Sequence, residues 1–225
     1  MNPELEVLPD AEAVAARAAA FVADRVRAAA RDGRRFALAV SGGRTPGRMF
    51  ALLADLDVPW EAIAMWQVDE RVAPPDDPER NLTHLLESLG EATVVELHPM
   101  PVEHDDLEQA AAAYAADLPP AFDLVHLGLG ADGHTASLFP GDPAAEVTDR
   151  DVALTGEHLG HRRMTLTLPV LDRAGELLWV VTGHEKAAAL AGLLAHDPAI
   201  PAGRPAARRQ TVLADRAAAP DAGLT

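Results

Sequence analysis

Four short polar segments carry the residues whose types and spacing suit chemistry on a small anionic substrate. They are SGGRTP (41–46), DER (69–71), GADGH (130–134) and TGHEK (182–186). A histidine that ends a glycine-rich segment suits a general base, because its ordinary pKa lies close to neutral pH. We therefore predict that His134 is the base and that Asp132 holds its tautomer or contacts a substrate hydroxyl. A helix-capping aspartate beside a structural histidine is the alternative.

The glycine segment and the lysine are typical of anion binding. Glycines let main-chain N–H groups approach an anion closely, and a helix N-terminus adds positive potential. The segment Ser41-Gly42-Gly43-Arg44-Thr45 therefore predicts a phosphate or carboxylate site, although an ordinary tight turn uses the same residues. Lys186 is the only lysine of the chain and falls in the first turn of an expected helix. A cation is unfavourable there unless an anion neutralises it.

Two arginines complete the predicted site. Arg71 suits a cation that stabilises a developing oxyanion, with Asp69 orienting it or the substrate hydroxyls. Arg163 opens a predicted strand and, with Lys186, suits a phosphate through charge-assisted hydrogen bonds. Taken singly, each of these charges is also typical of a solvated surface residue.

The composition argues against several other classes of function. The 225 residues include 19 Lys and Arg against 35 Asp and Glu, and the net charge of −16 disfavours nucleic acid and anionic membranes as partners. The chain has no cysteine, which excludes disulfide and thiolate chemistry. The histidines lack paired-ligand spacing, so we expect no metal. No apolar run is long enough for a membrane span and no signal peptide is recognisable, so we expect a cytoplasmic protein.

Buried strands that alternate with helices must position these segments. Apolar runs predict strands at 36–41, 63–69, 93–97, 122–130, 163–168, 177–183 and 210–213, with 151–155 pairing antiparallel to 163–168. Helices are predicted at 10–32, 46–53, 81–89, 105–117 and 185–195, with Asp10 and Asn81 as caps.

This alternation is typical of an α/β fold. We predict one domain (1–225) with a mostly parallel, doubly wound sheet, helices on both faces and a loose tail over 216–225. Ligands of such sheets bind beyond the carboxyl ends of the strands. Because each polar segment directly follows a predicted strand, the four segments are expected to face one pocket.

In this order, the polar segments resemble the 6-phosphogluconolactonase family, which shares its fold with the glucosamine-6-phosphate deaminases. The resembling segments are LAVSGGRTP (38–46), VDERVAPPDDPERN (68–81), LGLGADGHTASLFPG (127–141), RRMTLTLPVL (162–171) and VVTGHEK (180–186). GADGHTASLFPG is the most specific of these strings. The resemblance implies hydrolysis of a small sugar-phosphate lactone, the δ-lactone of 6-phosphogluconate, in the oxidative pentose phosphate pathway. It implies no metal or cofactor, and we expect a monomer or a small homo-oligomer.

The resemblance also implies a role for each site residue. His134 would take a proton from water and later protonate the ring oxygen, Asp132 would position it or the substrate, and Arg71 would stabilise the oxyanion. The phosphate would be held by Ser41, Gly42, Gly43, Thr45, Arg163 and Lys186. Arg44 and Arg80 stand where the family often has serine, and their roles stay open.

Two rival functions remain open at this point. The deaminases have, in place of GADGHTASLFPG, a segment that resembles GxDGHIAFNEPG, in which a glutamate assists ring opening. They also tend to have an aromatic residue after Asp-Glu. Phe139 and Arg71 stand at those positions here, which favours lactone hydrolysis. A non-catalytic sugar-phosphate-binding module, as in some transcription regulators, needs a DNA-binding partner domain. The segment before the first expected strand, near residue 36, is too short for one.

Overall fold

The main sheet consists of seven strands, all paired in parallel, in the computed structural model, which describes residues 2–75, 77–90 and 96–220. In spatial order they are β1 (Glu4–Leu8), β10 (Gln210–Asp215), β9 (Leu177–Val181), β6 (Leu124–Leu127), β2 (Phe36–Val40), β3 (Ile63–Gln67) and β5 (Glu96–His98). The central strands are continuous apolar runs because both faces of the sheet are covered.

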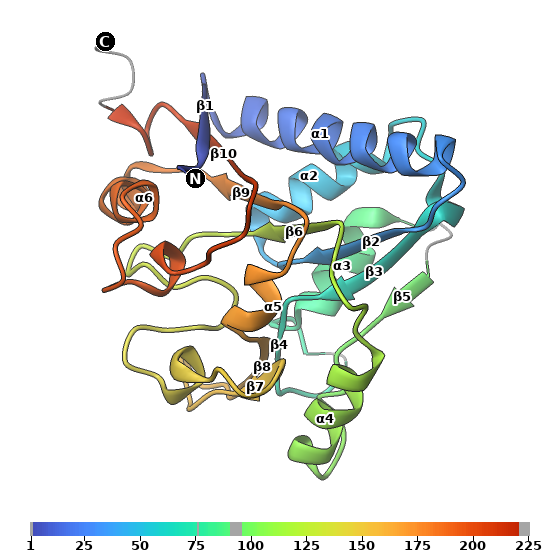
Figure 1. Ribbon diagram of the computed structural model, residues 1–225, viewed down its shortest axis with the longest axis vertical. Coiled ribbons are helices and arrows are strands. Elements are labelled where there is room, and N and C mark those ends of the chain that lie inside the picture. Colours follow the sequence, from blue (N-terminus) through green and yellow to red (C-terminus); the bar gives the residue numbers. More distant parts are fainter. Residues whose placement is uncertain (1, 76, 91–95, 221–225) are drawn as a thin grey trace.

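A second, antiparallel sheet lies below the first in Figure 1. Its order is β4 (Asp69–Arg71), β8 (Arg163–Leu166) and β7 (Val152–Leu154), so the predicted antiparallel pairing of 151–155 with 163–168 is confirmed. The predicted strand 63–69 is divided between the two sheets. Val68 makes the junction, since its N–H donates to Val40 at 2.9 Å and its carbonyl accepts from Leu166 at 2.8 Å. The DER segment therefore belongs to the small sheet.

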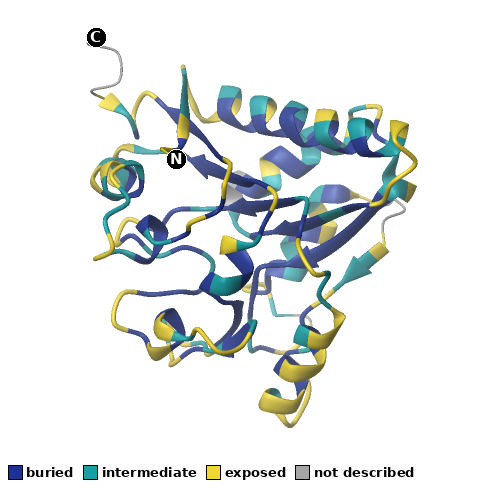
Figure 2. Ribbon diagram, in the orientation of Figure 1, coloured by how far each residue is buried: buried dark blue, intermediate teal, exposed yellow. Residues whose placement is uncertain are grey.

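Helices cover both faces of the main sheet, as predicted for a doubly wound fold (Figure 1). One apolar core contains residues of α1 (Ala11–Arg31), α2 (Arg44–Ala54) and α3 (Asn81–Leu89). The other contains residues of α4 (Leu107–Asp117), α5 (Leu168–Asp172) and α6 (Ala187–Leu194). Figure 2 shows the central strands buried between these two layers. Short 3₁₀ turns lie at Trp60–Ala62, Pro143–Glu146, His184–Lys186 and Pro201–Gly203.

Alternation along the strands assigns side chains to the two cores. Leu38 and Leu124 pack with α1, α2 and α3, whereas their neighbours Ala39 and Val125 pack with the other layer. No helix among the described residues is long and apolar enough to cross a membrane.

The sheet begins earlier in the chain than predicted. The first strand is β1, not the strand at 36, and it pairs in parallel with β10 from Glu4 opposite Thr211 to Leu8 opposite Asp215. β1 lies at the edge of the sheet and none of its residues is fully buried, so it has no apolar run to reveal it. The prediction that the first sheet strand begins near residue 36 is therefore wrong.

The ends of several elements also differ from the prediction. Asp10 caps α1 as predicted, but Arg80 rather than Asn81 holds the N-cap position of α3. Part of the predicted strand 93–97 lies outside the described residues, and β5 runs from Glu96 to His98. The chain after β10 is packed at first, because Ala218 is buried and its N–H donates to Asp215 at 2.8 Å. Residues 221–225 of the expected loose tail lie outside the described residues.

The strand order creates a switch point between β2 and β6. From β2 the chain proceeds to β3 and β5 on one side, and then returns to β6 on the other side of β2. Connections leave the two strands in opposite directions, so a crevice opens beyond their carboxyl ends.

Candidate active site

A cavity of about 540 Å³ occupies this edge of the sheet. Eight of the ten predicted site residues line it, and they come from all four polar segments and from β8: Ser41, Gly42, Gly43, Asp69, Arg71, His134, Arg163 and Lys186. Asp132 does not line the cavity but contacts His134. The side chain of Thr45, like that of Arg44, lies outside the described part of the structure.

His134 has a partner that sets its tautomer. Its Nδ1 lies 2.5 Å from Oδ1 of Asp132, and its main-chain N–H donates to the same oxygen at 3.1 Å. Burial by itself would raise the pKa of Asp132, but the N–H, charge and ring of His134 hold that pKa below its ordinary value. The ionised Asp132 therefore accepts the Nδ1 proton and leaves the Nε2 lone pair free to act as a base.

The glycines of the GADGH segment make room for this pair. A Cβ at Gly130 would lie 2.1 Å from Nδ1 of His134 and 2.5 Å from Oδ1 of Asp132. The N–H of Gly130 donates to the His134 carbonyl at 2.8 Å, and Gly133 adopts a φ of 85° in the same turn. A side chain at position 130 would displace the imidazole, so glycine is required for the geometry of the His134–Asp132 pair.

Arg71 and Arg163 lie directly opposite each other on β4 and β8. Burial and the charge of Arg71 lower the pKa of Arg163 from its ordinary value. The Nε atoms of both arginines are buried and have no hydrogen-bond partner among the described residues. Since like charges directly opposite in a sheet are unfavourable, an anion in the cavity would stabilise this wall.

Asp69 contacts a different group from the one expected. Its Oδ2 accepts from the hydroxyl of Ser137 at 2.6 Å, and burial raises the pKa of this carboxyl despite that bond and the nearby arginines. The Arg71 guanidinium is instead held by the carbonyl of Glu79. Asp69 therefore acts on Arg71 through charge and not through a hydrogen bond.

The glycine turn after β2 fits closely against α3. A Cβ at Gly42 would lie 2.2 Å from the side-chain oxygen of Asn81, and Gly43 has a φ of 120° at the N-cap of α2. The hydroxyl of Ser41 donates to the carbonyl of His126 at 3.2 Å. The turn thus presents its main chain to the cavity at the N-terminus of α2, the arrangement that favours anions.

Lys186 follows β9 at the end of a 3₁₀ turn and directly precedes α6. It makes no ion pair among the described residues, although Glu185 and Asp215 also line the cavity. Asp215 and Asn81 were missed by the sequence prediction. Asp215 ends the last strand, so the rule that ligands bind beyond carboxyl ends of strands would have found it, had that strand been extended by two residues.

Comparison with known proteins relates the chain to one enzyme family. The family model described as glucosamine-6-phosphate isomerases/6-phosphogluconolactonase matches residues 9–214. The chain belongs to this family. A 6-phosphogluconolactonase from Synechocystis sp. is 37% identical over 210 residues, which cover 88% of this chain and 87% of that protein. One from Streptomyces coelicolor is 33% identical and covers 97% of this chain and 94% of that protein.

Solved structures agree with the family relationship. A 6-phosphogluconolactonase from Trypanosoma cruzi superposes with a TM-score of 0.87 and 25% identity, covering 98% of this chain and 97% of that one. A monomeric glucosamine-6-phosphate deaminase superposes with a TM-score of 0.86 at 19% identity, covering 96% of this chain and 99% of that one. The fold alone therefore does not separate the two activities of the family.

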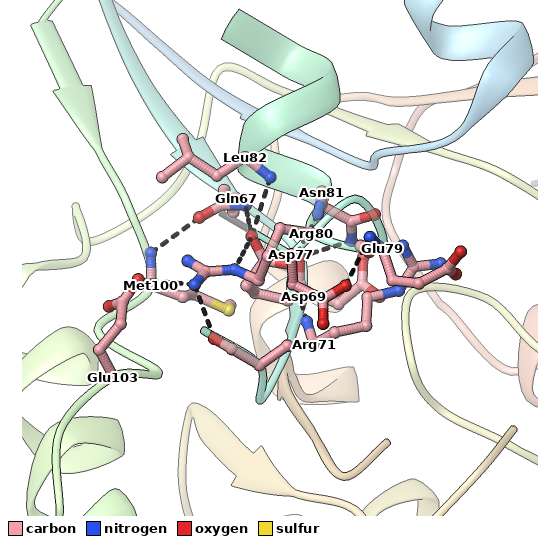
Figure 3. A network of polar contacts seen from close by, with 12 residues as sticks. Gln67, Asp69, Arg71, Asp77, Glu79, Arg80, Asn81, Leu82, Met100 and Glu103 are labelled. Atoms are coloured by element: carbon pink, nitrogen blue, oxygen red, sulfur yellow. Dashed lines mark hydrogen bonds and ion pairs between the residues drawn. The ribbon is translucent and has the colours of Figure 1, made fainter. Parts of the chain in front are cut away.

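Arg80, which stands where the family often has serine, is not among the residues that line the cavity but lies buried in a network of polar contacts (Figure 3). Its Nε lies 3.1 Å from Glu70 and its Nη1 lies 2.6 Å from Glu103. Glu70 is fully buried and accepts the N–H groups of Asn81 and Leu82 at 2.8 Å. The carboxylate of one strand therefore caps α3, a role that the sequence assigned to Asn81.

Glu70 also connects this network to the cavity wall. It accepts the N–H of Arg71 at 2.7 Å and a side-chain N–H of Gln67 at 2.9 Å. The side chain of Asn81 in turn donates to the carbonyl of Asp69 at 3.0 Å. The two outer residues of the DER segment face the cavity while the middle one anchors the segment from behind.

Proposed function

We propose that this protein hydrolyses 6-phospho-D-glucono-1,5-lactone to 6-phospho-D-gluconate, the 6-phosphogluconolactonase reaction of the pentose phosphate pathway. The relatives of this name that span nearly the whole chain support the proposal. The observation that carries it is a histidine base, fixed by Asp132, that shares one cavity with three cations. These cations, Arg71, Arg163 and Lys186, make no ion pair among the described residues, and the two arginines lie directly opposite each other. We further predict that the protein works in the cytoplasm.

His134 would supply both proton transfers. Its Nε2 takes a proton from water as the water oxygen bonds to the lactone carbonyl carbon, and the electrons of the C=O bond move onto oxygen. When the tetrahedral intermediate collapses, the bond from that carbon to the ring oxygen breaks. The imidazolium then gives its proton to the ring oxygen, which becomes a hydroxyl of the product acid.

The cations would bind two different negative groups, the phosphate of the substrate and the oxyanion of the tetrahedral intermediate. The phosphate lies at the glycine turn with Lys186 and Arg163, and Arg71 stabilises the oxyanion of the intermediate. Holding the phosphate fixes the lactone carbon near the base, which removes much of the entropic cost of the attack. Since Arg71 and Arg163 are direct neighbours, the two anionic groups enter the same side of the cavity.

The neighbour of the base favours hydrolysis over deamination. The ring of Phe139, which lies where the deaminase pattern has a glutamate, has its centroid 4.6 Å from that of His134. An apolar ring transfers no proton, so the group that assists ring opening in the deaminases is replaced by a packing contact.

A coupled assay tests the proposal directly. The lactone is generated freshly by glucose-6-phosphate oxidation, EDTA is present, and the rate is corrected for spontaneous opening. Turnover above that background is expected, with no ammonia released from glucosamine 6-phosphate. Ammonia release at an enzymatic rate, or binding of the phosphosugar without turnover, would assign the protein to one of the two rival functions.

Replacing the base tests the mechanism. His134→Ala is expected to reduce kcat by roughly 10²- to 10⁴-fold, since general base catalysis contributes about that much. Binding of 6-phosphogluconate, measured by calorimetry, should stay within a few-fold of the wild type because the phosphate ligands remain. High residual turnover combined with lost binding would contradict the role of His134.

A further inference from the structure

The ring of Phe139 connects the proposed base to a histidine outside the cavity. Beside its contact with His134, Phe139 lies 5.2 Å from Cζ of Arg163 and stacks on the ring of His158. That stack has a centroid distance of 3.9 Å and an interplanar angle of 18°. Phe139 is buried, and His158 is not among the residues that line the cavity. A displacement of the His158 ring would therefore reach the base through one side chain.

His158 is itself anchored by a buried carboxylate. Its Nε2 lies 2.7 Å from Oδ2 of Asp142, which is 6% exposed. The same carboxylate accepts the N–H groups of Ala144 at 2.8 Å and Gly156 at 2.9 Å. Asp142 is thus held by three donors, and it fixes the edge of the His158 ring whose face lies on Phe139.

The main chain of His158 makes a separate contact with the site. Its carbonyl accepts from Nη2 of Arg163 at 3.4 Å. Any residue at position 158 supplies that carbonyl, whereas only an aromatic or imidazole ring supplies the stack. The two contributions are therefore separable by substitution of the side chain.

We propose that His158 is a positioning residue for the lactone hydrolysis, which with Asp142 holds Phe139 against His134 and so fixes the plane of the catalytic imidazole. The inference rests on the function proposed above. His158 touches neither water nor lactone in this scheme. A base that is misplaced by a fraction of an ångström loses alignment with the attacking water, and such losses appear in turnover.

The test separates the ring of His158 from its hydrogen bond. His158→Ala should reduce kcat about three- to tenfold, the range that one aromatic contact supports, with KM within twofold because the Arg163 contact is retained. His158→Phe keeps the stack without the Asp142 bond and should restore most of the turnover. His158→Gln keeps a donor for Asp142 without the ring and should remain as slow as His158→Ala.

Two controls separate positioning from general stability. His161→Ala changes a histidine of the same hairpin whose side chain makes no polar or ring contact within the described residues, and it should leave kcat unchanged. In a Phe139→Leu background, His158→Ala should have no further effect on kcat, because the connection to His134 is already broken. Melting temperatures of all variants are measured alongside.

Three outcomes would overturn the inference. They are wild-type kcat in His158→Ala, equal rescue by Gln and Phe, or a full additional loss in the Phe139→Leu background. A wild-type chain without lactonase activity would instead contradict the proposed function, so the two failures are distinguishable. A variant that fails to fold does not end the test, since Phe and Gln at position 158 are compared with each other.

Discussion

At the scale of single residues, the site depends on cations that make no ion pair among the described residues. Arg71 and Arg163 repel each other, and Lys186 has no ion pair among the described residues. In a chain of net charge −16, such a local concentration of cations selects small anions that fit the cavity. In the proposed complex, the substrate phosphate would supply the negative charge that these cations lack.

Lys186→Ala is expected to raise KM about 10- to 100-fold while kcat changes little. A charge-assisted hydrogen bond is worth about 1.5–3 kcal/mol, and it is made equally in the ground state and the transition state. The measurement is initial rate against lactone concentration, with Lys186→Arg as the control that keeps the charge. A fall in kcat at unchanged KM would show that Lys186 acts on the reacting carbon instead of the phosphate.

Gly130→Ala is expected to abolish most of the turnover while the protein stays folded. The new Cβ would overlap the imidazole of His134 at 2.1 Å, so the ring has to leave its place beside Asp132. The matched comparison is Gly128→Ala, which adds a Cβ to the lining of the same cavity but meets no protein atom within 4 Å and so leaves the imidazole in place. Circular dichroism checks the fold of both, and if Gly130→Ala retained wild-type kcat, the close fit between loop and base would be of no consequence.

At the scale of elements, the cavity wall depends on the joint between β4 and α3. Glu70 is the single carboxylate that caps the helix, holds the N–H of Arg71 and faces the buried Arg80. The strand and the helix therefore cannot move independently. Arg80, in turn, serves this joint and not the substrate.

Glu70→Gln is expected to lower the free energy of unfolding by up to about 3–5 kcal/mol, because it removes the fully buried one of the two carboxylates that pair with Arg80 and leaves only the exposed Glu103. Urea denaturation measures the loss. The control is Glu12→Gln, which removes an exposed ion pair with Arg48 and should leave the transition midpoint unchanged. Equal midpoints for wild type and Glu70→Gln would show that the network contributes no stability.

At the scale of the whole molecule, the predictable part of the fold is the part that local patterns encode. The strands at the centre of the sheet are apolar on both faces, so apolar runs in the sequence reveal them. The start of α1 is likewise revealed by its capping residue, Asp10. The edge strand β1 is only partly buried and acidic, and its place depends on β10, some 200 residues later, as the register of Glu4 with Thr211 shows. Val68, where the chain changes sheets, looks like any other strand residue.

The same distinction holds for the site. Residues that follow strands, such as Ser41 and His134, are predicted because all parallel strands end at one edge. Glu70 and His158 were not recognised, since one caps a helix eleven residues away and the other stacks on a ring nineteen residues away. Contacts of this kind depend on how separate elements meet, which no local pattern records.

The buried His126 makes the stability of the molecule depend on pH. It lies at the centre of the main sheet on β6, fully buried, and burial lowers its pKa to about 3. In the unfolded chain its pKa returns to about 6.5, so between these values the unfolded state binds a proton that the folded state does not. Stability is therefore lost as pH falls below 6.5, and the loss continues until pH 3.

His126→Gln should remove this dependence. Between pH 7 and pH 5 the free energy of unfolding of the wild type should fall by about 2 kcal/mol more than that of the variant, since each pH unit below 6.5 is worth about 1.4 kcal/mol. Urea denaturation at the two pH values gives both numbers, and His104→Gln, at an exposed histidine, should behave as wild type. Parallel losses in wild type and His126→Gln would mean that the imidazole takes up its proton without unfolding. The contacts between His126 on β6 and Ser41, which lines the cavity, would then tolerate a charged imidazole. This part of the cavity wall would be less rigid than the burial of His126 indicates.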